Sequence, residues 1–218
     1  MKKLFFARCI PVFLLVTMLF SLCSCNLIIK MPFGTDYNAS DSISIDPSYE
    51  NFVTLNIKNF GMIVIELHPE AAPITVENFK RLVSEGFYDG LTFHRVADLT
   101  YTGGYIVQGG DPKGDGSGGS DTKIKGEFQT NGVDNPLKHI RGTVSMARST
   151  DKNSASSQFF ICTDILTHLD GYYATFGMVV EGMDVVDEIA SVETDYHSRP
   201  ITPVVIEWAK IGKPVTAQ

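Results

Sequence analysis

Short apolar runs separated by turn-forming residues dominate the chain from Phe52 onward, and they constrain its fold more than any other feature. Two of these runs, FVTLNIKN and GMIVIELH, alternate apolar with other residues on either side of Asn59-Phe60-Gly61, which predicts a β-hairpin. Further strands are predicted, between stretches rich in Gly, Asp and Ser, at residues 91–96, 105–108, 143–147, 158–162, 174–180 and 203–211.

Two segments within this β-rich pattern have helical spacing instead. The first follows Thr75, which we expect to cap it, and should end at Gly86, while the second follows Gly182. Their apolar residues are Val76, Phe79, Leu82 and Val83 in the first segment and Met183, Val186, Ile189 and Ala190 in the second. Many strands with two isolated helices predict a mainly β protein, a closed antiparallel barrel of eight strands whose open ends are covered by two short helices.

The first 25 residues form a separate segment. Lys2, Lys3 and Arg8 precede an apolar run at residues 10–22, which has about the length of the apolar region of a signal peptide. The alternative, a membrane-spanning anchor, requires about 20 apolar residues, whereas this run is shorter and is interrupted by Pro11. We therefore expect residues 1–24 to be an export signal.

The apolar run ends in Leu22-Cys23-Ser24-Cys25, which resembles the lipobox of bacterial lipoproteins. In that motif a cysteine receives a diacylglycerol thioether before the signal is cleaved, and the resemblance predicts Cys25 as the lipidated residue. Cys23 is the poorer candidate, because Leu22 would stand where the signal peptidase expects a small side chain. Two or more acyl chains, at about 0.8 kcal/mol per buried CH₂, are enough for stable anchoring. The expected location is the outer face of a bacterial cell membrane, or the outer membrane where two are present.

The composition of the processed chain limits the classes of partner that we expect it to bind. Loss of residues 1–24 removes three basic residues and no acidic ones, which leaves 15 basic and 25 acidic residues and a net charge of −10. Nucleic acid is therefore excluded as an expected partner. With Cys9 and Cys23 removed and Cys25 acylated, Cys162 has no intramolecular partner, so we expect no disulfide.

Residues 26–50 are mostly Ser, Asp, Asn, Tyr and Pro with weak periodicity, which is typical of a flexible tether. The predicted organisation is thus a signal at residues 1–24, a tether at 25–50 and a folded domain at 51–214. We expect this domain to be a monomer.

The glycine-rich stretch GDGSGG matches several motifs only in part. Gly114, Gly116 and Gly119 satisfy the dinucleotide-binding pattern G-x-G-x-x-G, but no helix with an apolar face follows them. The stretch also resembles the nucleophile loop of trypsin-type proteases, yet nothing places a His and an Asp to activate Ser117 or Ser120. Its aspartates lack the later ligands of a calcium loop, and the scattered histidines lack metal-ligand spacing. A surface loop without a metal site is the better interpretation.

Four segments in order resemble the cyclophilin family of peptidyl-prolyl isomerases. They are FHRV at residues 93–96, VQGGDPKGDGSGG at 107–119, SMAR with SSQFFICT within 145–163, and LDG with FG within 169–177. The resemblance covers residues 52–213, essentially the whole folded domain. It implies an enzyme that isomerises X-Pro bonds in proline-containing polypeptides, without a cofactor. Combined with the export signal, it predicts a membrane-tethered isomerase that helps exported proteins to fold.

The residue types agree with this chemistry. An X-Pro bond rotates through a twisted amide with a barrier of about 18 to 20 kcal/mol, and a catalyst needs only to favour the twisted form. An arginine that donates to the prolyl nitrogen keeps its lone pair out of resonance, while an apolar pocket grips the ring. By the resemblance Arg95 is the catalytic arginine, Gln108 and Phe160 complete the catalytic group, and the backbone of Ala147 positions the substrate.

Alternation along the strands predicts which residues face the substrate. Ile106 and Gln108 share one face, as do Gln158 and Phe160, whereas Val107, Phe159 and Ile161 should turn into the barrel. By the resemblance, the proline pocket is formed by Tyr105, Ile106, Phe160 and Leu169.

Three departures from the family pattern concern the groove. Arg95 and Gln108 are 13 positions apart, which is wider than usual and implies an enlarged hairpin loop at residues 97–104. His168 stands in place of the groove tryptophan, and Tyr173 in place of the groove histidine. These changes bear on ligand preference more than on activity. The alternative function is a non-catalytic module that binds proline-containing segments as a scaffold or holdase, and retention of Arg95, Gln108 and Phe160 favours the enzyme.

Overall fold

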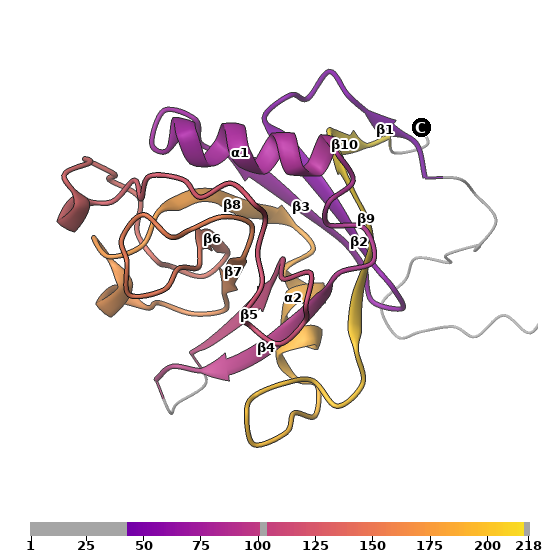
Figure 1. The fold of residues 1–218 in the computed structure, drawn as a ribbon. Helices are drawn as coiled ribbons and strands as arrows, with labels where there is room; N and C mark the ends of the chain where they lie inside the picture. Colours follow the sequence, from indigo (N-terminus) through magenta and orange to yellow (C-terminus); the bar gives the residue numbers. More distant parts are fainter. Residues whose placement is uncertain (1–42, 101–103, 216–218) are drawn as a thin grey trace, which may run out of the picture. The chain divides into compact units, whose positions relative to one another are not determined.

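The computed structural model describes residues 43–100 and 104–215, so the predicted signal peptide and Cys25 lie outside the described residues. Within these residues eight strands form a closed barrel in the order β2-β3-β8-β6-β7-β5-β4-β9, and every neighbouring pair is antiparallel (Figure 1). The barrel strands are β2 (Phe52–Ile57), β3 (Gly61–Leu67), β4 (Thr92–Asp98), β5 (Tyr105–Gly109), β6 (Thr143–Met146), β7 (Phe159–Cys162), β8 (Thr175–Glu181) and β9 (Val204–Ile211). The predicted eight-stranded barrel is confirmed.

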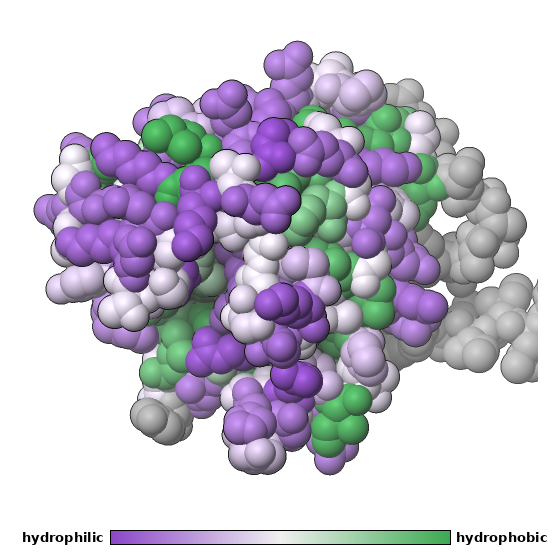
Figure 2. Space-filling model, viewed as in Figure 1, coloured by the Kyte–Doolittle hydropathy of each residue, from purple (hydrophilic) through white to green (hydrophobic). Residues whose placement is uncertain are grey.

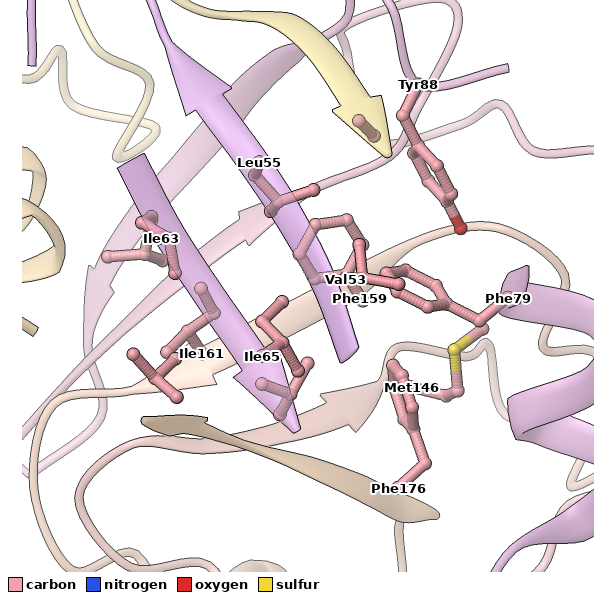
Figure 3. Packing of buried hydrophobic residues seen from close by; sticks show 14 of the residues in the cluster. Val53, Leu55, Ile63, Ile65, Phe79, Tyr88, Met146, Phe159, Ile161 and Phe176 are labelled. Atoms are coloured by element: carbon pink, nitrogen blue, oxygen red, sulfur yellow. The ribbon is translucent and has the colours of Figure 1, made fainter. Parts of the chain in front are cut away.

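The barrel interior is filled by alternate residues of these strands. Val53 and Leu55 of β2 face Ile63 and Ile65 of β3, and the rings of Phe159 on β7 and Phe79 on α1 belong to the same cluster (Figure 3). Asn59 adopts a positive φ of 67° at the hairpin between β2 and β3, as the predicted turn requires. Successive side chains of a strand point to opposite faces. The residues that alternate with the core residues therefore point out of the barrel and can form a second surface.

The first helix, α1 (Pro73–Ser84), packs its apolar face onto the barrel core and is followed by Gly86 at φ 68°. The prediction that Thr75 caps it is wrong, since Thr75 lies inside the first turn. The cap comes from a distant residue: the buried Glu127 carboxylate accepts the backbone N–H groups of Ile74 and Thr75 at 3.1 and 2.8 Å. It also accepts the Thr75 hydroxyl at 2.7 Å. A carboxylate at this end favours the helix by satisfying free N–H groups and by facing the positive end of its dipole.

The second helix, α2 (Met183–Ala190), begins directly after Gly182, as predicted. Gly182 has φ 86°, and a Cβ there would lie 2.1 Å from the Met62 carbonyl oxygen, so only glycine fits this turn. In Figure 1 the two helices lie apart, α1 above the strands and α2 below them. Two short 3₁₀ helices, η1 (Gln129–Asn131) and η2 (Thr167–Leu169), occur in the loops.

The segment before β2 does not behave as a tether up to residue 50. β1 (Ile45–Asp46) pairs with β10 (Lys213–Pro214), and the Lys213 ammonium lies over the rings of Tyr49 and Phe52, 5.8 and 5.1 Å from their centroids. The Lys213 ammonium also forms an ion pair with the Glu181 carboxylate, with 2.7 Å between Nζ and Oε1. The folded unit therefore begins before residue 45, and these contacts link its two ends.

One face of the molecule is seen in space-filling form in Figure 2. In Figure 2 the face in view is largely hydrophilic, with apolar residues in small separate patches. None of the helices in the described part of the chain is long and apolar enough to span a bilayer.

Candidate active site

A β-bulge in β4 sets the direction of Arg95. Phe93 pairs with Gly109 of β5, but the next paired residue on β4 is Arg95, opposite Gln108, so His94 is an extra residue in the ladder. Phe93 packs in the barrel core, and strict alternation would send Arg95 into the core as well. The extra residue reverses the phase and places Arg95 on the outer face, half-buried.

Arg95 of β4 begins a chain of polar contacts that continues through Gln108 of β5 to Gln158, the residue before β7. Its Nη1 donates to Gln108 Oε1 at 3.2 Å, and Gln108 Nε2 donates to Gln158 Oε1 at 2.9 Å. Gln158 Nε2 donates in turn to the carbonyls of Gly116 and Gly118 at 3.1 and 2.7 Å. The three side chains are therefore held in one orientation, with the remaining guanidinium donors of Arg95 on the outer face.

Beside this chain lies an apolar surface that we call the groove cluster. It is separate from the barrel core and is carried by the outer faces of β4, β5 and β7 together with the segment that follows β7. Its buried members are Ala97, Ile106, Phe160, Cys162 and Leu166, and its partly buried members are Leu99, Ala147, Leu169 and Tyr173. The sequence prediction that Ile106 and Phe160 face outward while Val107, Phe159 and Ile161 face the core is confirmed.

The Phe160 ring is fixed from two sides. His139 stacks on it with centroids 5.9 Å apart and planes inclined by 13°, and Tyr173 meets it edge-on at 5.9 Å and 85°. The Arg148 guanidinium lies 4.7 Å from the Tyr173 ring centroid. Phe160 is therefore held in one orientation within the groove cluster, where it is almost fully buried.

His139 is held by its own hydrogen bonds. Asp170 Oδ1 accepts the backbone N–H of His139 at 2.8 Å and lies 3.0 Å from Nδ1, while Nε2 lies 3.1 Å from the Ser145 hydroxyl. Burial lowers the pKa of His139 and outweighs the opposing pull of Asp170. The neutral ring then donates from Nδ1 to the carboxylate and accepts from Ser145, which locks its plane against Phe160.

A polar cleft of about 360 Å³ adjoins the groove cluster at Ala147. Its other walls are Gln108, Arg148, Ser149, Ser154, Ser156, Gln158 and residues of the loop between Gly116 and Lys123. Asp111 shapes this loop: its carboxylate accepts the N–H groups of Lys113 at 2.8 Å and Gly116 at 2.6 Å. Burial pushes the pKa of Asp111 upward, but the N–H donors of the loop outweigh it and the net shift is downward.

Most of the sequence-predicted site residues meet in this region. Arg95, Gln108 and Gln158 form the polar chain, and Ile106, Phe160, Ala147, Leu169 and Tyr173 belong to the groove cluster. The Ala147 N–H already donates to the Gln158 carbonyl at 2.9 Å, so only its carbonyl is left for a substrate. His168 lies on η2, exposed and close enough to His139 to lower the pKa of that ring.

Tyr105 is placed differently from the prediction. It packs against the barrel core rather than in the groove cluster, because it precedes Ile106 in β5 and adjacent residues of a strand face opposite ways. Its backbone is paired with Thr163, whose hydroxyl accepts the Tyr105 N–H at 3.0 Å. The structure thus groups Tyr105 with the core.

The supporting role of four residues was not identified from the sequence. Ser145 and Arg148 lie in the family segment SMAR and Asp170 in LDG, but their contacts with His139, Tyr173 and Phe160 exist only in the fold, and His139 lies in none of the family segments. The described residues contain no group of three or more His, Cys, Asp or Glu side chains that could hold a metal ion. The Ser145 hydroxyl lies beside His139, but both residues are buried, at 0% and 1% exposed, so this pair supports Phe160 and is out of reach of a ligand. The arrangement is suited to binding an apolar ring next to a fixed cationic donor.

Comparisons with known proteins agree with this geometry. The family model described as cyclophilin type peptidyl-prolyl cis-trans isomerase/CLD matches residues 52–211. Peptidyl-prolyl cis-trans isomerase A of Dickeya dadantii is 41% identical over 162 residues, which cover 70% of this chain and 80% of that protein. Peptidyl-prolyl cis-trans isomerase B of Bacillus subtilis is 46% identical over 135 residues, which cover 62% and 87%.

A solved structure is similar over the same domain. The cyclophilin type peptidyl-prolyl cis-trans isomerase of Cryptosporidium parvum, crystallised in the presence of the dipeptide Ala-Pro, matches with a TM-score of 0.66 and 30% identity. The match covers 74% of this chain and 99% of that one.

Proposed function

The chain belongs to the cyclophilin-type peptidyl-prolyl cis-trans isomerases and is an isomerase of this kind, and from this premise we propose that it acts on exported proteins while anchored to a membrane by a lipid at Cys25. The observation that carries the catalytic part is the Arg95–Gln108 pair beside the groove cluster. The part that concerns export rests on the sequence of residues 1–25.

In the proposed mechanism the proline ring lies against Phe160, Ile106 and Leu169. The pocket is apolar and its Phe160 wall is fixed by His139 and Tyr173, so ring binding displaces water at little conformational cost. This binding holds the X-Pro bond beside Arg95. The similarity to a protein crystallised with Ala-Pro supports proline-containing peptides as ligands of the same groove here.

Arg95 then acts on the twisted amide. Gln108 accepts from Nη1, which orients the guanidinium and leaves its other N–H groups available to the prolyl nitrogen. The nitrogen lone pair can accept such a bond only when it has left conjugation with the carbonyl, so the contact is made chiefly in the transition state. A charge-assisted hydrogen bond of about 1.5 to 3 kcal/mol made there corresponds to roughly ten- to a hundredfold in rate.

Uncatalysed X-Pro isomerisation takes tens of seconds or more, slow enough to limit the folding of newly exported chains. A lipid anchor would keep the enzyme where those chains emerge. Within the described domain, β1 and β10 lie beside β2, whereas β7, which carries Phe160, is four strands away from β2 on either side of the barrel.

A peptide assay tests the catalytic part. The full chain in detergent should accelerate cis-to-trans conversion of a short X-Pro peptide, measured by coupling to a protease that cleaves only the trans form. A protein that binds proline-containing peptides without accelerating this conversion would instead be a binding module.

Labelling with a fatty acid tests the anchor, with two matched variants. The unmodified chain and Cys23→Ser should incorporate the label, whereas Cys25→Ser should not and should remain an unprocessed precursor or leave the membrane fraction. Equal labelling of both variants would exclude Cys25 as the anchor.

A further inference from the structure

The hairpin between β4 and β5 adds a residue to the groove cluster that the catalytic chemistry does not require. Leu99, just beyond the end of β4, is partly buried against the cluster. It is the member contributed by the hairpin end rather than by the barrel strands or the segment after β7. Its exposed part forms one end of the apolar surface.

Hydrogen bonds fix the backbone at this end. The Leu99 N–H donates to the Gly104 carbonyl at 2.9 Å, and the Gly104 N–H donates to the Thr100 hydroxyl at 2.9 Å. The fit is tight, because a Cβ on Gly104 would lie 2.5 Å from Thr100 Cγ2 and 3.1 Å from Leu166 Cδ2. The Leu99 backbone is therefore fixed to Gly104, and Leu99 and Leu166 belong to the same apolar cluster.

The strand registers locate Leu99 relative to the catalytic residues. Arg95 pairs with Gln108 and Gln108 with Phe160, which makes one row across the groove; Ala97 and Ile106 form part of the next row. Leu99 lies one step further along β4, four residues from Arg95, or about 13 Å at the rise of about 3.3 Å per residue of a strand. The polar cleft borders the opposite end of the groove, at Gln158 and Ala147.

A bound peptide would therefore meet different surfaces on the two sides of its proline. With the ring against Phe160 and Ile106, one side of the peptide reaches hydrogen-bonding groups of the cleft. The other side reaches Leu99, whose partly exposed side chain offers apolar contact, while Leu166 of the same cluster is fully buried. The distance left to Leu99 corresponds to about two or three residues of extended peptide.

We propose that Leu99 is a specificity residue, which selects a substrate with an apolar side chain two or three residues from the proline, on the side away from the polar cleft. Leu99 and that side chain remove each other from water, and a polar or charged side chain there would lose hydration without a partner. The inference rests on the isomerase activity and is independent of export and of the lipid anchor.

The test uses peptides of one length in which a single Phe is moved through the three positions on each side of the proline. NMR exchange between cis and trans forms gives kcat/KM for the full chain without a chromogenic group. Phe at the two distant positions on one side should raise kcat/KM about three- to tenfold over Ser, and Leu99→Ala should abolish this gain by lowering kcat/KM for the Phe peptides more than for the Ser peptides.

Two further variants separate specificity from damage to the fold. Leu99→Lys should shift the preference at the same positions from Phe to Glu, a change that loss of structure cannot produce. Ile74→Ala is the matched control, since Ile74 is a partly exposed apolar residue (42%) on α1 and outside the groove cluster. It should leave every peptide unchanged.

Two results would overturn the proposal. One is that Leu99→Ala lowers kcat/KM equally for all peptides, and the other is that the Phe preference survives in Leu99→Ala. A wild-type chain without isomerase activity would instead refute the enzymatic assignment itself, so the two failures are distinguishable.

Discussion

On the inner face of β7, Phe159 meets Phe79, Tyr88 and Phe93 edge-on, with ring centroids 5.5, 5.6 and 6.0 Å apart. On the outer face the next residue, Phe160, meets His139 and Tyr173 at 5.9 Å. Both rings are almost fully buried, at 0% and 3% exposed. The partners of Phe159 are core aromatics, whereas those of Phe160 are fixed by Asp170, Ser145 and Arg148.

This difference separates stability from activity on a single strand. A core face is complete in the folded state, so changes there alter the free energy of unfolding. The groove face is also largely buried, but its side chains are oriented by hydrogen bonds as well as by packing, and it adjoins the Arg95–Gln108 pair. Changes on the groove face should therefore alter kcat/KM more than stability.

The largest effect is expected for Phe159→Ala. Loss of its ring leaves a cavity among three aromatic partners and should lower the free energy of unfolding by about 3 to 5 kcal/mol. Denaturant unfolding followed by far-UV circular dichroism measures this. Phe160→Ala is the matched variant, and it should lose less stability but more activity per folded molecule. Equal stability losses with equal activity losses would break the comparison between the two faces.

Arg95→Ala tests the groove face alone. It should lower kcat/KM roughly ten- to a hundredfold, because it removes a charge-assisted hydrogen bond made in the transition state, while the unfolding midpoint stays nearly constant. Arg141→Ala is a suitable control, since Arg141 forms an exposed ion pair with Asp187. Wild-type activity in a folded Arg95→Ala protein would contradict the mechanism.

Asp170→Ala should lower both stability and kcat/KM, because the Asp170 carboxylate binds His139 and His139 stacks on Phe160. It leaves two buried donors of His139 without an acceptor, which should cost about 1 to 2 kcal/mol of stability. A reduction of kcat/KM by a few-fold should accompany it as Phe160 loses its fixed partner. Asp170→Asn keeps an oxygen at this site and should recover most of both losses. An unchanged kcat/KM in Asp170→Ala would show that Phe160 does not depend on this support.

The smallest effect is expected from pH and concerns His94, the bulge residue. Its ring is buried, its two nitrogens have no hydrogen-bond partner among the described residues, and burial is the main cause that lowers its pKa. The unfolded chain takes up a proton as the pH falls through about 6.5, while the folded state resists it, so stability should decline below that pH. The depressed carboxyl pKa values of Asp111 and Asp170 act only at lower pH.

The free energy of unfolding, measured between pH 7 and 5, should therefore fall with decreasing pH, and its slope against pH should be smaller in His94→Asn. Part of the slope should remain, because burial also lowers the pKa of His139. An identical slope in His94→Asn and the unmodified protein would mean that protonation of His94 does not contribute to the pH dependence of stability in this range.

Much of the groove could be predicted from the sequence. Alternation in IVQ and QFFIC was enough to separate Val107, Phe159 and Ile161 from Ile106 and Phe160, because side-chain direction in a strand depends only on position. The motifs around Arg95, Gln108 and Gln158 identified the family, since their order and spacing are specific. The turns at Asn59, Gly86 and Gly182 were also predictable, because a positive φ restricts the residues that can occupy it.

Features that depend on distant partners could not be predicted. Thr75 was expected to cap α1, but the Glu127 carboxylate, 52 positions away, does so. Residues 45–50 were predicted to belong to the tether, because nothing in their composition indicates that Ile45 and Asp46 pair with β10. The contacts of His139 with Asp170 and of Leu99 with the groove cluster likewise exist only once the barrel closes.

The direction of Arg95 combines both cases. The sequence identifies the residue, but alternation from Phe93 would have turned it into the core. It faces the groove because His94 is an extra residue opposite β5, and a bulge is a property of two paired strands rather than of either one. The sequence alone therefore determined which residues could carry the chemistry, whereas the pairing of β4 with β5 decided that the arginine faces the substrate.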